Sequence, residues 1–286
     1  MRSPRLLCLL ALSALLSGCG SSPKGTDPNP GVPPNPSAVP LILDGNWEIS
    51  APIAPSTTFP APLPSPVANF TGALHSSKGK VTGTFRALAT PTGSQCVDIF
   101  TNLPVTGTLD SSGNLNLSIA LPGGTATVTA ALPSNLRSKT AATWQIVAGP
   151  CAMPTTAVHI EQFAPLTGAY TGTFSRLDLA TRSPIPGTSV AVTAAFNQSP
   201  APNADGQFPL TGTVAVTGSC TGVIAITDGI VAGNGVESRS FSLPFPHPIP
   251  PIFNGAIDLT ATTLIAAFDL LPACGNQAYA GILTRQ

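Results

Sequence analysis

The stretch "NLNLSIALPGGTATVTAAL", residues 114–132, carries the pattern that decides the fold. In each half of it an apolar side chain occupies every second position, and a Pro-Gly-Gly step stands between the halves. Strict alternation puts the apolar side chains on one face of a β-strand, whereas an amphipathic helix needs a spacing of three to four residues. The stretch therefore predicts two antiparallel strands joined by a tight turn.

Similar alternation continues along the chain, broken by short runs of Gly, Pro, Asn, Asp and Ser. Asp228-Gly229, between two apolar runs, predicts a short hairpin turn. Eight or nine strands are expected over 166–286. Eight are expected in the first half, near residues 45–50, 67–75, 80–88, 103–109, 114–121, 125–132, 141–148 and 156–163.

A repeat is visible in the spacing of four cysteines, which are Cys96, Cys151, Cys220 and Cys274. The first two are 55 residues apart and the last two 54, and "LDGNW" at 43–47 lies 123 residues before "LTGAY" at 166–170. These near-equal spacings predict one unit used twice, over 42–163 and 164–286. Together with the short connections they predict an all-β protein with two tandem antiparallel units of about eight strands each, either barrels or sandwiches.

The four cysteines allow three pairings. The repeat favours Cys96–Cys151 and Cys220–Cys274, because each disulfide then lies within one unit. A zinc site normally contains C-x₂₋₄-C pairs, and the sequence has none. We therefore expect two disulfides and no metal.

The N-terminus has the order of a signal sequence. Arg2 and Arg5 precede the apolar run "LLCLLALSALL" at 6–16, which is too short to span a bilayer. The run ends in Leu16-Ser17-Gly18-Cys19, which resembles the lipobox of bacterial lipoproteins. The resemblance implies a signal peptide over 1–18 and attachment of acyl chains such as palmitate to Cys19.

The segment after Cys19 is rich in proline and cannot pack a core, so residues 19–41 are expected to be a disordered tether. Gly20 stands where Gram-negative lipoproteins of the inner membrane commonly have Asp. The resemblance thus implies a lipid anchor in the outer membrane, with the folded part facing the periplasm or the cell surface.

Composition and motifs narrow the function. Charged residues make up only 8% of the chain and the formal net charge is zero, so no basic patch for nucleic acid is expected. The sequence has no nucleophile elbow, P-loop or dinucleotide-binding motif, which predicts a protein that is not an enzyme and has no cofactor. His159 and Glu161 would share one face of a strand, the usual arrangement of a surface contact.

Two proline-rich apolar segments stand out, at 51–67 and 243–253. The second and the strand end before it contain four large apolar side chains that form a candidate contact loop, Phe241, Phe245, Ile249 and Phe253. Exposed, they would make an apolar contact surface, whereas packed down they would cover a barrel end.

Two functions from different classes remain. The first is a structural or interaction module that binds an envelope protein or glycan. The second follows from "GNW" at 45–47, which resembles the G-x-W of lipocalins. That resemblance implies a barrel with Trp47 near its closed end and carriage of a small apolar ligand.

Overall fold

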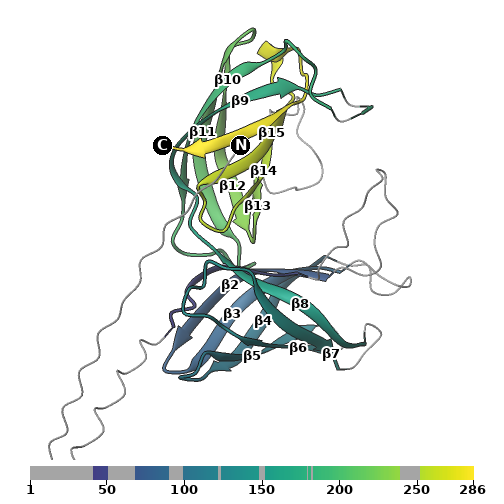
Figure 1. The fold of residues 1–286 in the computed structure, drawn as a ribbon, viewed down its shortest axis with the longest axis vertical. Helices are drawn as coiled ribbons and strands as arrows, with labels where there is room; N and C mark the ends of the chain where they lie inside the picture. Colours follow the sequence, from purple (N-terminus) through teal and green to yellow (C-terminus); the bar gives the residue numbers. More distant parts are fainter. Residues whose placement is uncertain are drawn as a thin grey trace, which may run out of the picture. The chain divides into compact units, whose positions relative to one another are not determined.

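The computed structural model describes residues 41–50, 68–89, 99–121, 124–147, 152–178, 180–181, 183–238 and 252–286. Within these ranges the chain forms β-strands and one short 3₁₀ turn, and all of the strands belong to one compact unit, Val39–Gln286. The predicted fold class is confirmed, because the strands close into two antiparallel barrels of eight strands each (Figure 1).

In the first barrel, each strand pairs with the next one in sequence, and β1 closes the ring by pairing with β8. This order makes it an up-and-down barrel. Its strands are β1 (Gly45–Ser50), β2 (Ala68–Ser77), β3 (Lys80–Ala89), β4 (Ile99–Leu109), β5 (Asn114–Leu121), β6 (Gly124–Ala131), β7 (Thr140–Ile146) and β8 (Met153–Phe163).

The second barrel repeats this plan, with β16 pairing to β9. A 3₁₀ turn, η1 (Pro272–Cys274), precedes its last strand. Its strands are β9 (Thr167–Arg176), β10 (Val190–Gln198), β11 (Phe208–Gly218), β12 (Gly222–Ala232), β13 (Gly235–Glu237), β14 (Ile252–Ile257), β15 (Thr263–Asp269) and β16 (Tyr279–Arg285). The predicted duplication is thereby confirmed at the level of topology.

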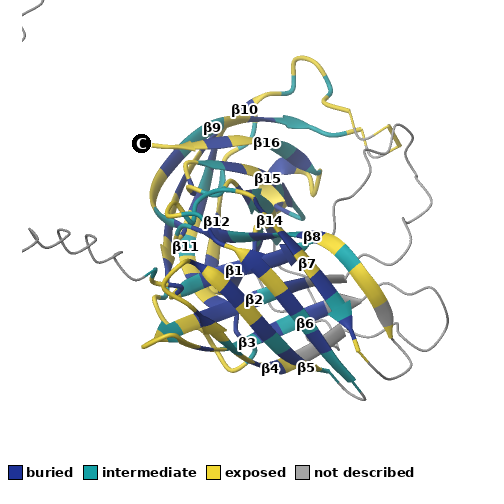
Figure 2. Cartoon of the chain, turned by 60° about the horizontal axis from the view of Figure 1, so that its bottom comes forward, coloured by how far each residue is buried: buried dark blue, intermediate teal, exposed yellow. Residues whose placement is uncertain are grey.

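Apolar and polar residues that alternate along the sequence lie alternately on the inside and the outside of the barrel wall. The blocks of blue and yellow along the strands show this alternation of buried and exposed residues (Figure 2). In β10 every second side chain is buried and the others are exposed along the whole strand. The buried side chains line an eight-stranded interior, which is just wide enough to be filled by side chains or to hold one small ligand.

Five of the glycines in the recurring Thr-Gly steps face inward where the neighbouring strand comes close; they are Gly72, Gly83, Gly107, Gly172 and Gly212. A Cβ atom on Gly83 would lie only 2.1 Å from the backbone oxygen of Ala73 on β2. Contacts under 3.0 Å require something to move, so the glycine is needed for the strands to approach.

The prediction of a hairpin turn at Asp228-Gly229 is wrong. Both residues lie inside the continuous strand β12, where Leu210 of β11 pairs with Gly229 but Gly212 pairs with Ile226. One extra residue is thus accommodated in β12, which defines a β-bulge. The chain turns further on instead, at Gly233 and Asn234 between β12 and β13.

Each barrel has its own hydrophobic core, but the division is not complete. Ala73 and Phe163 lie in β2 and β8, which are strands of the first barrel. Their buried side chains nevertheless belong to the core cluster of the second barrel. Inside the first barrel the core is built around Trp47 and Trp144, with Phe70 in edge contact with Trp144.

Candidate functional site

The structure describes only part of the candidate site residues. Cys19, Cys96, Cys151, Phe241, Phe245 and Ile249 lie outside the described residues, as does most of both proline-rich segments. Phe253 lies in strand β14, and its side chain is fully buried. Phe253 is therefore part of the core and does not contribute to an exposed contact surface.

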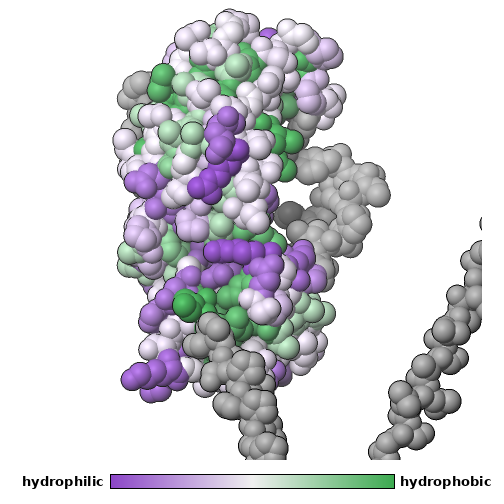
Figure 3. Space-filling view, turned by 60° about the vertical axis from the view of Figure 1, so that its left-hand side comes forward, coloured by the Kyte–Doolittle hydropathy of each residue, from purple (hydrophilic) through white to green (hydrophobic). Residues whose placement is uncertain are grey.

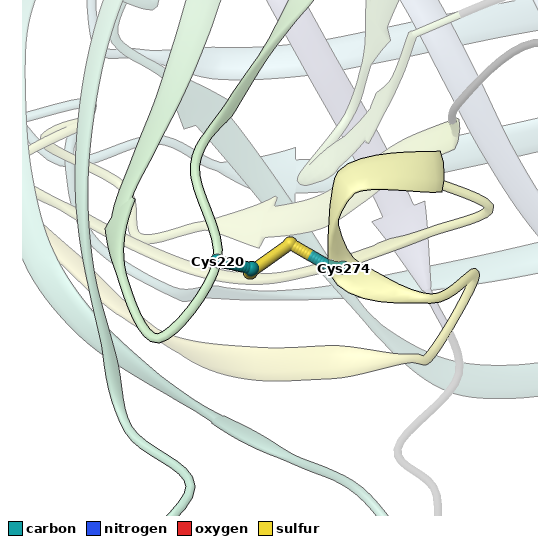
Figure 4. The surroundings of a disulfide bond; sticks show 2 residues. All are labelled: Cys220 and Cys274. Atoms are coloured by element: carbon teal, nitrogen blue, oxygen red, sulfur yellow. A yellow bond between two sulfur atoms is a disulfide. The ribbon is translucent and has the colours of Figure 1, made fainter.

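Cys220 and Cys274 form the expected disulfide (Figure 4). It joins the turn between β11 and β12 to η1, which precedes β16. In the chain-entropy description, closing a loop with a sequence separation of 54 residues contributes roughly 4 kcal/mol of stability. Cys96 and Cys151 occupy the equivalent sequence positions of the first repeat. Because both lie outside the described residues, their pairing stays a prediction.

Aromatic side chains occupy the interior of the second barrel. Phe268 stacks on Tyr279 with ring centroids 5.1 Å apart and on Phe174 at 5.9 Å. Phe196 contacts both Tyr170 and Phe253. These six rings therefore pack against one another inside the second barrel.

The outside of the second barrel carries an uncharged face on β14, β15, β16 and β9. Ile265 and Ile282 lie opposite each other in the β15–β16 pairing and are 62% and 53% exposed. We define the uncharged face by a set of outward residues on these strands that leaves out Asp269, which is also outward and ends β15; the set is Asn254, Ala256, Thr263, Ile265, Ala267, Ala280, Ile282, Thr284, Thr171, Thr173 and Ser175. In the view of Figure 3 the second barrel, in the upper half, is mostly white or pale and is interrupted by purple and green groups.

A different surface, on the outside of β1, is buried against the turn between β12 and β13. The Asn46 side chain donates a hydrogen bond to the Gly233 carbonyl oxygen and accepts one from the Gly233 N–H, both at 2.7 Å. The Asn234 N–H donates to Glu48 Oε2 at 3.0 Å. Gly233 has a φ of 57°, and a Cβ there would lie 2.5 Å from Glu48 Oε2, so the turn requires glycine.

Three charged side chains meet beside this turn. Glu48 lies directly opposite Glu161 in the β1–β8 pairing, and Lys139 Nζ is 3.7 Å from Glu161 Oε1. Burial raises the pKa of Glu48; the bond from Asn234 opposes that shift, and the charge of Glu161 adds to it. His159 lies with Glu161 on the outward side of β8, as predicted, and is half-buried.

Next to these carboxyl groups is an open cleft of about 450 Å³. Its lining comes from the connection before β7, the end of β8, the β12–β13 turn, and the end of β14 with the turn that follows. The residues that line it are Arg137, Glu161, Phe163, Asn234, Ile257, Asp258, Leu259 and Thr260. It has the size range of small-molecule sites in proteins.

Within the cleft, Arg137 differs from the other charged residues. Its Nη1 atom is buried and has no hydrogen-bond partner among the described residues, and burial lowers its pKa from the ordinary value. Asp258, in contrast, accepts hydrogen bonds from the Thr262 N–H at 2.9 Å and the Thr262 hydroxyl at 2.8 Å.

Among the described residues, no group of three or more His, Cys, Asp or Glu is close enough to hold a metal ion. No helix in the described ranges is long and apolar enough to cross a membrane.

Comparison with known proteins does not add a relative. No family model matches the chain, and neither a curated protein nor a solved structure matches it.

Sequence reasoning missed the cleft and the buried contact at Asn46. Asn46 and Gly233 are 187 residues apart, and no local pattern links them. Asn46 and Glu48 did offer a signal, because they are polar residues in a strand whose other side faces the core, but that pattern is typical of any outward surface.

Proposed function

We propose that this protein is a lipid-anchored interaction module of the cell envelope, which binds an envelope protein or glycan with the outside of its barrels. The anchor rests on the lipobox-like Leu16-Ser17-Gly18-Cys19 and the proline-rich segment after it. The observation that carries the choice of an interaction module is the packing of aromatic side chains into the barrel interior. Aromatic rings packed inside the second barrel favour contacts on the outside over carriage of a ligand inside.

The uncharged face is the surface best suited to such contacts. Charged residues are depleted at the core of protein interfaces, and the exposed pair Ile265 and Ile282 lies within this face. Thr, Ser and Asn around the pair keep the face soluble and can form hydrogen bonds with a protein or a glycan.

The anchor is tested by metabolic labelling with an alkyne analogue of palmitate. The natural chain should take up the label and remain in the membrane fraction, whereas Cys19→Ala should lose the label and become soluble. Continued acylation of Cys19→Ala would refute the anchor.

The partner is tested with a photo-crosslinking amino acid placed at Ile282, and at Ser112 in the β4–β5 turn as a control. In intact cells, position 282 should give an adduct of defined mass and position 112 should not. Equal crosslinking at both positions, or none at Ile282, would contradict a specific contact through the uncharged face. A defined lipid retained in native mass spectra would favour carriage instead.

A further inference from the structure

The cleft beside β8 contains a positive group that no described residue neutralises. Arg137 lines the cleft, its Nη1 atom is buried without a hydrogen-bond partner, and it takes part in neither ion pair of the described residues. A guanidinium drawn partly out of water is costly unless an acceptor replaces the water. Its planar fork of N–H donors matches a carboxylate, which it can bind through two parallel hydrogen bonds.

The two carboxylates of the cleft already have partners. Glu161 lies within 3.7 Å of Lys139. Asp258 accepts hydrogen bonds from Thr262 and from the Thr260 hydroxyl at 3.2 Å. An anion that enters the cleft therefore meets Arg137 as the charged lining residue that remains outside both ion pairs and outside the Asp258 hydrogen bonds.

The other residues that line the cleft indicate the chemical character of the rest of the ligand. Phe163, Ile257 and Leu259 are apolar, and Asn234 and Thr260 are polar without charge. We propose that this cleft binds a small molecule with a carboxylate on a short apolar body, the carboxylate on Arg137 and the body against Phe163, Ile257 and Leu259. The site requires neither the lipid anchor nor a macromolecular partner, so it stands apart from the proposed function.

A carboxylate of this kind can come from the C-terminus of a peptide or from an alkanoic acid. The probes are N-acetyl-alanyl-alanine and hexanoate, each titrated by calorimetry against the full-length protein together with its own primary amide. At least one acid should bind, about tenfold or more tightly than its amide, because the amide removes the charge and keeps the shape. The acid that binds more tightly identifies the source.

Two variants assign the effect to Arg137. Arg137→Gln should bind acid and amide equally, and Arg137→Lys should keep part of the preference because it retains the charge without the fork. Lys80→Gln removes the same charge from the exposed start of β3 and should discriminate like the natural protein. Thermal unfolding confirms that each variant is folded.

The proposal is overturned by any of three results: neither acid binds, acid and amide bind the natural protein equally, or Arg137→Gln still prefers the acid. If Arg137→Gln fails to fold, the comparison of acid with amide on the natural protein decides alone.

Discussion

At the scale of single residues, Glu48 is a buried carboxyl group that couples stability to pH. Its pKa is raised mainly by burial and further by Glu161, so the folded protein holds this proton more readily than the unfolded chain does. The stability linked to Glu48 is therefore fully present below the ordinary value of 4.5 and is lost as the pH rises through the raised pKa of the folded state.

Glu48→Gln should raise the free energy of unfolding at neutral pH, because the amide avoids the buried charge and its oxygen can still accept the hydrogen bond from Asn234. The variant should also lose less stability than the natural protein as the pH rises from 4.5 to 7. Urea unfolding at a series of pH values measures both effects. Parallel pH profiles for the two proteins would show that Glu48 is not the coupled group.

Asn46 makes the second residue-scale prediction. Asn46→Ala removes both hydrogen bonds to Gly233 and leaves a buried N–H and a buried carbonyl without partners. The cost should be roughly 2–3 kcal/mol, measured by urea unfolding. Asn116→Ala on the exposed side of β5 is the matched control and should change stability by less than about 0.5 kcal/mol. Equal effects at the two positions would rule out a structural role for the Asn46 contact.

At the scale of elements, the inward glycines fix how closely the strands pack. Gly83→Ala on β3 places a methyl group 2.1 Å from the Ala73 carbonyl oxygen and should lower the free energy of unfolding by about 2 kcal/mol or more. At Gly235 a Cβ would come no closer than 3.3 Å to any neighbouring atom, so Gly235→Ala should cost much less. The midpoints of chemical unfolding compare the two variants, and a neutral Gly83→Ala would contradict the close approach.

Most strands were predictable, because a strand with one face in a core must alternate and the sequence shows that alternation directly. The error at Asp228-Gly229 has a physical cause. Asp-Gly is favoured in a hairpin turn because both residues tolerate a positive φ, but Asp228 and Gly229 have no positive φ here, and the extra residue forms a β-bulge in a continuous strand. The choice depends on the register with β11, where Leu210 and Gly212 are the partners, and that register is a long-range property.

The candidate site was less predictable than the strands. Arg137 and Asn234 line one cleft although nearly a hundred residues separate them in the sequence. Nothing near Arg137 in the sequence marks it as special, since its character comes from burial without a partner. The spacing of Cys220 and Cys274 did predict their bond, because the repeat carried that long-range information.

At the scale of the whole molecule, Phe163 links the two barrels energetically. It belongs to β8 of the first barrel, and its buried side chain is part of the core of the second. Phe163→Ala should cost about 3–5 kcal/mol, and hydrogen exchange should show lost protection in strands of the second barrel. Phe163→Leu, which keeps most of the apolar volume, should cost clearly less. Loss of protection confined to the first barrel would show that Phe163 does not serve the second core.

The closure of each ring by its first and last strands has a consequence for the ancestry of the chain. Since β1 pairs with β8 and β9 with β16, each barrel begins and ends on adjacent strands. Such a unit can be copied in tandem, or circularly permuted by joining its old ends and opening any other hairpin, without rethreading a strand. The three residues between β8 and β9 suffice to connect two copies. A chain with a third barrel is therefore accessible by gene fusion alone.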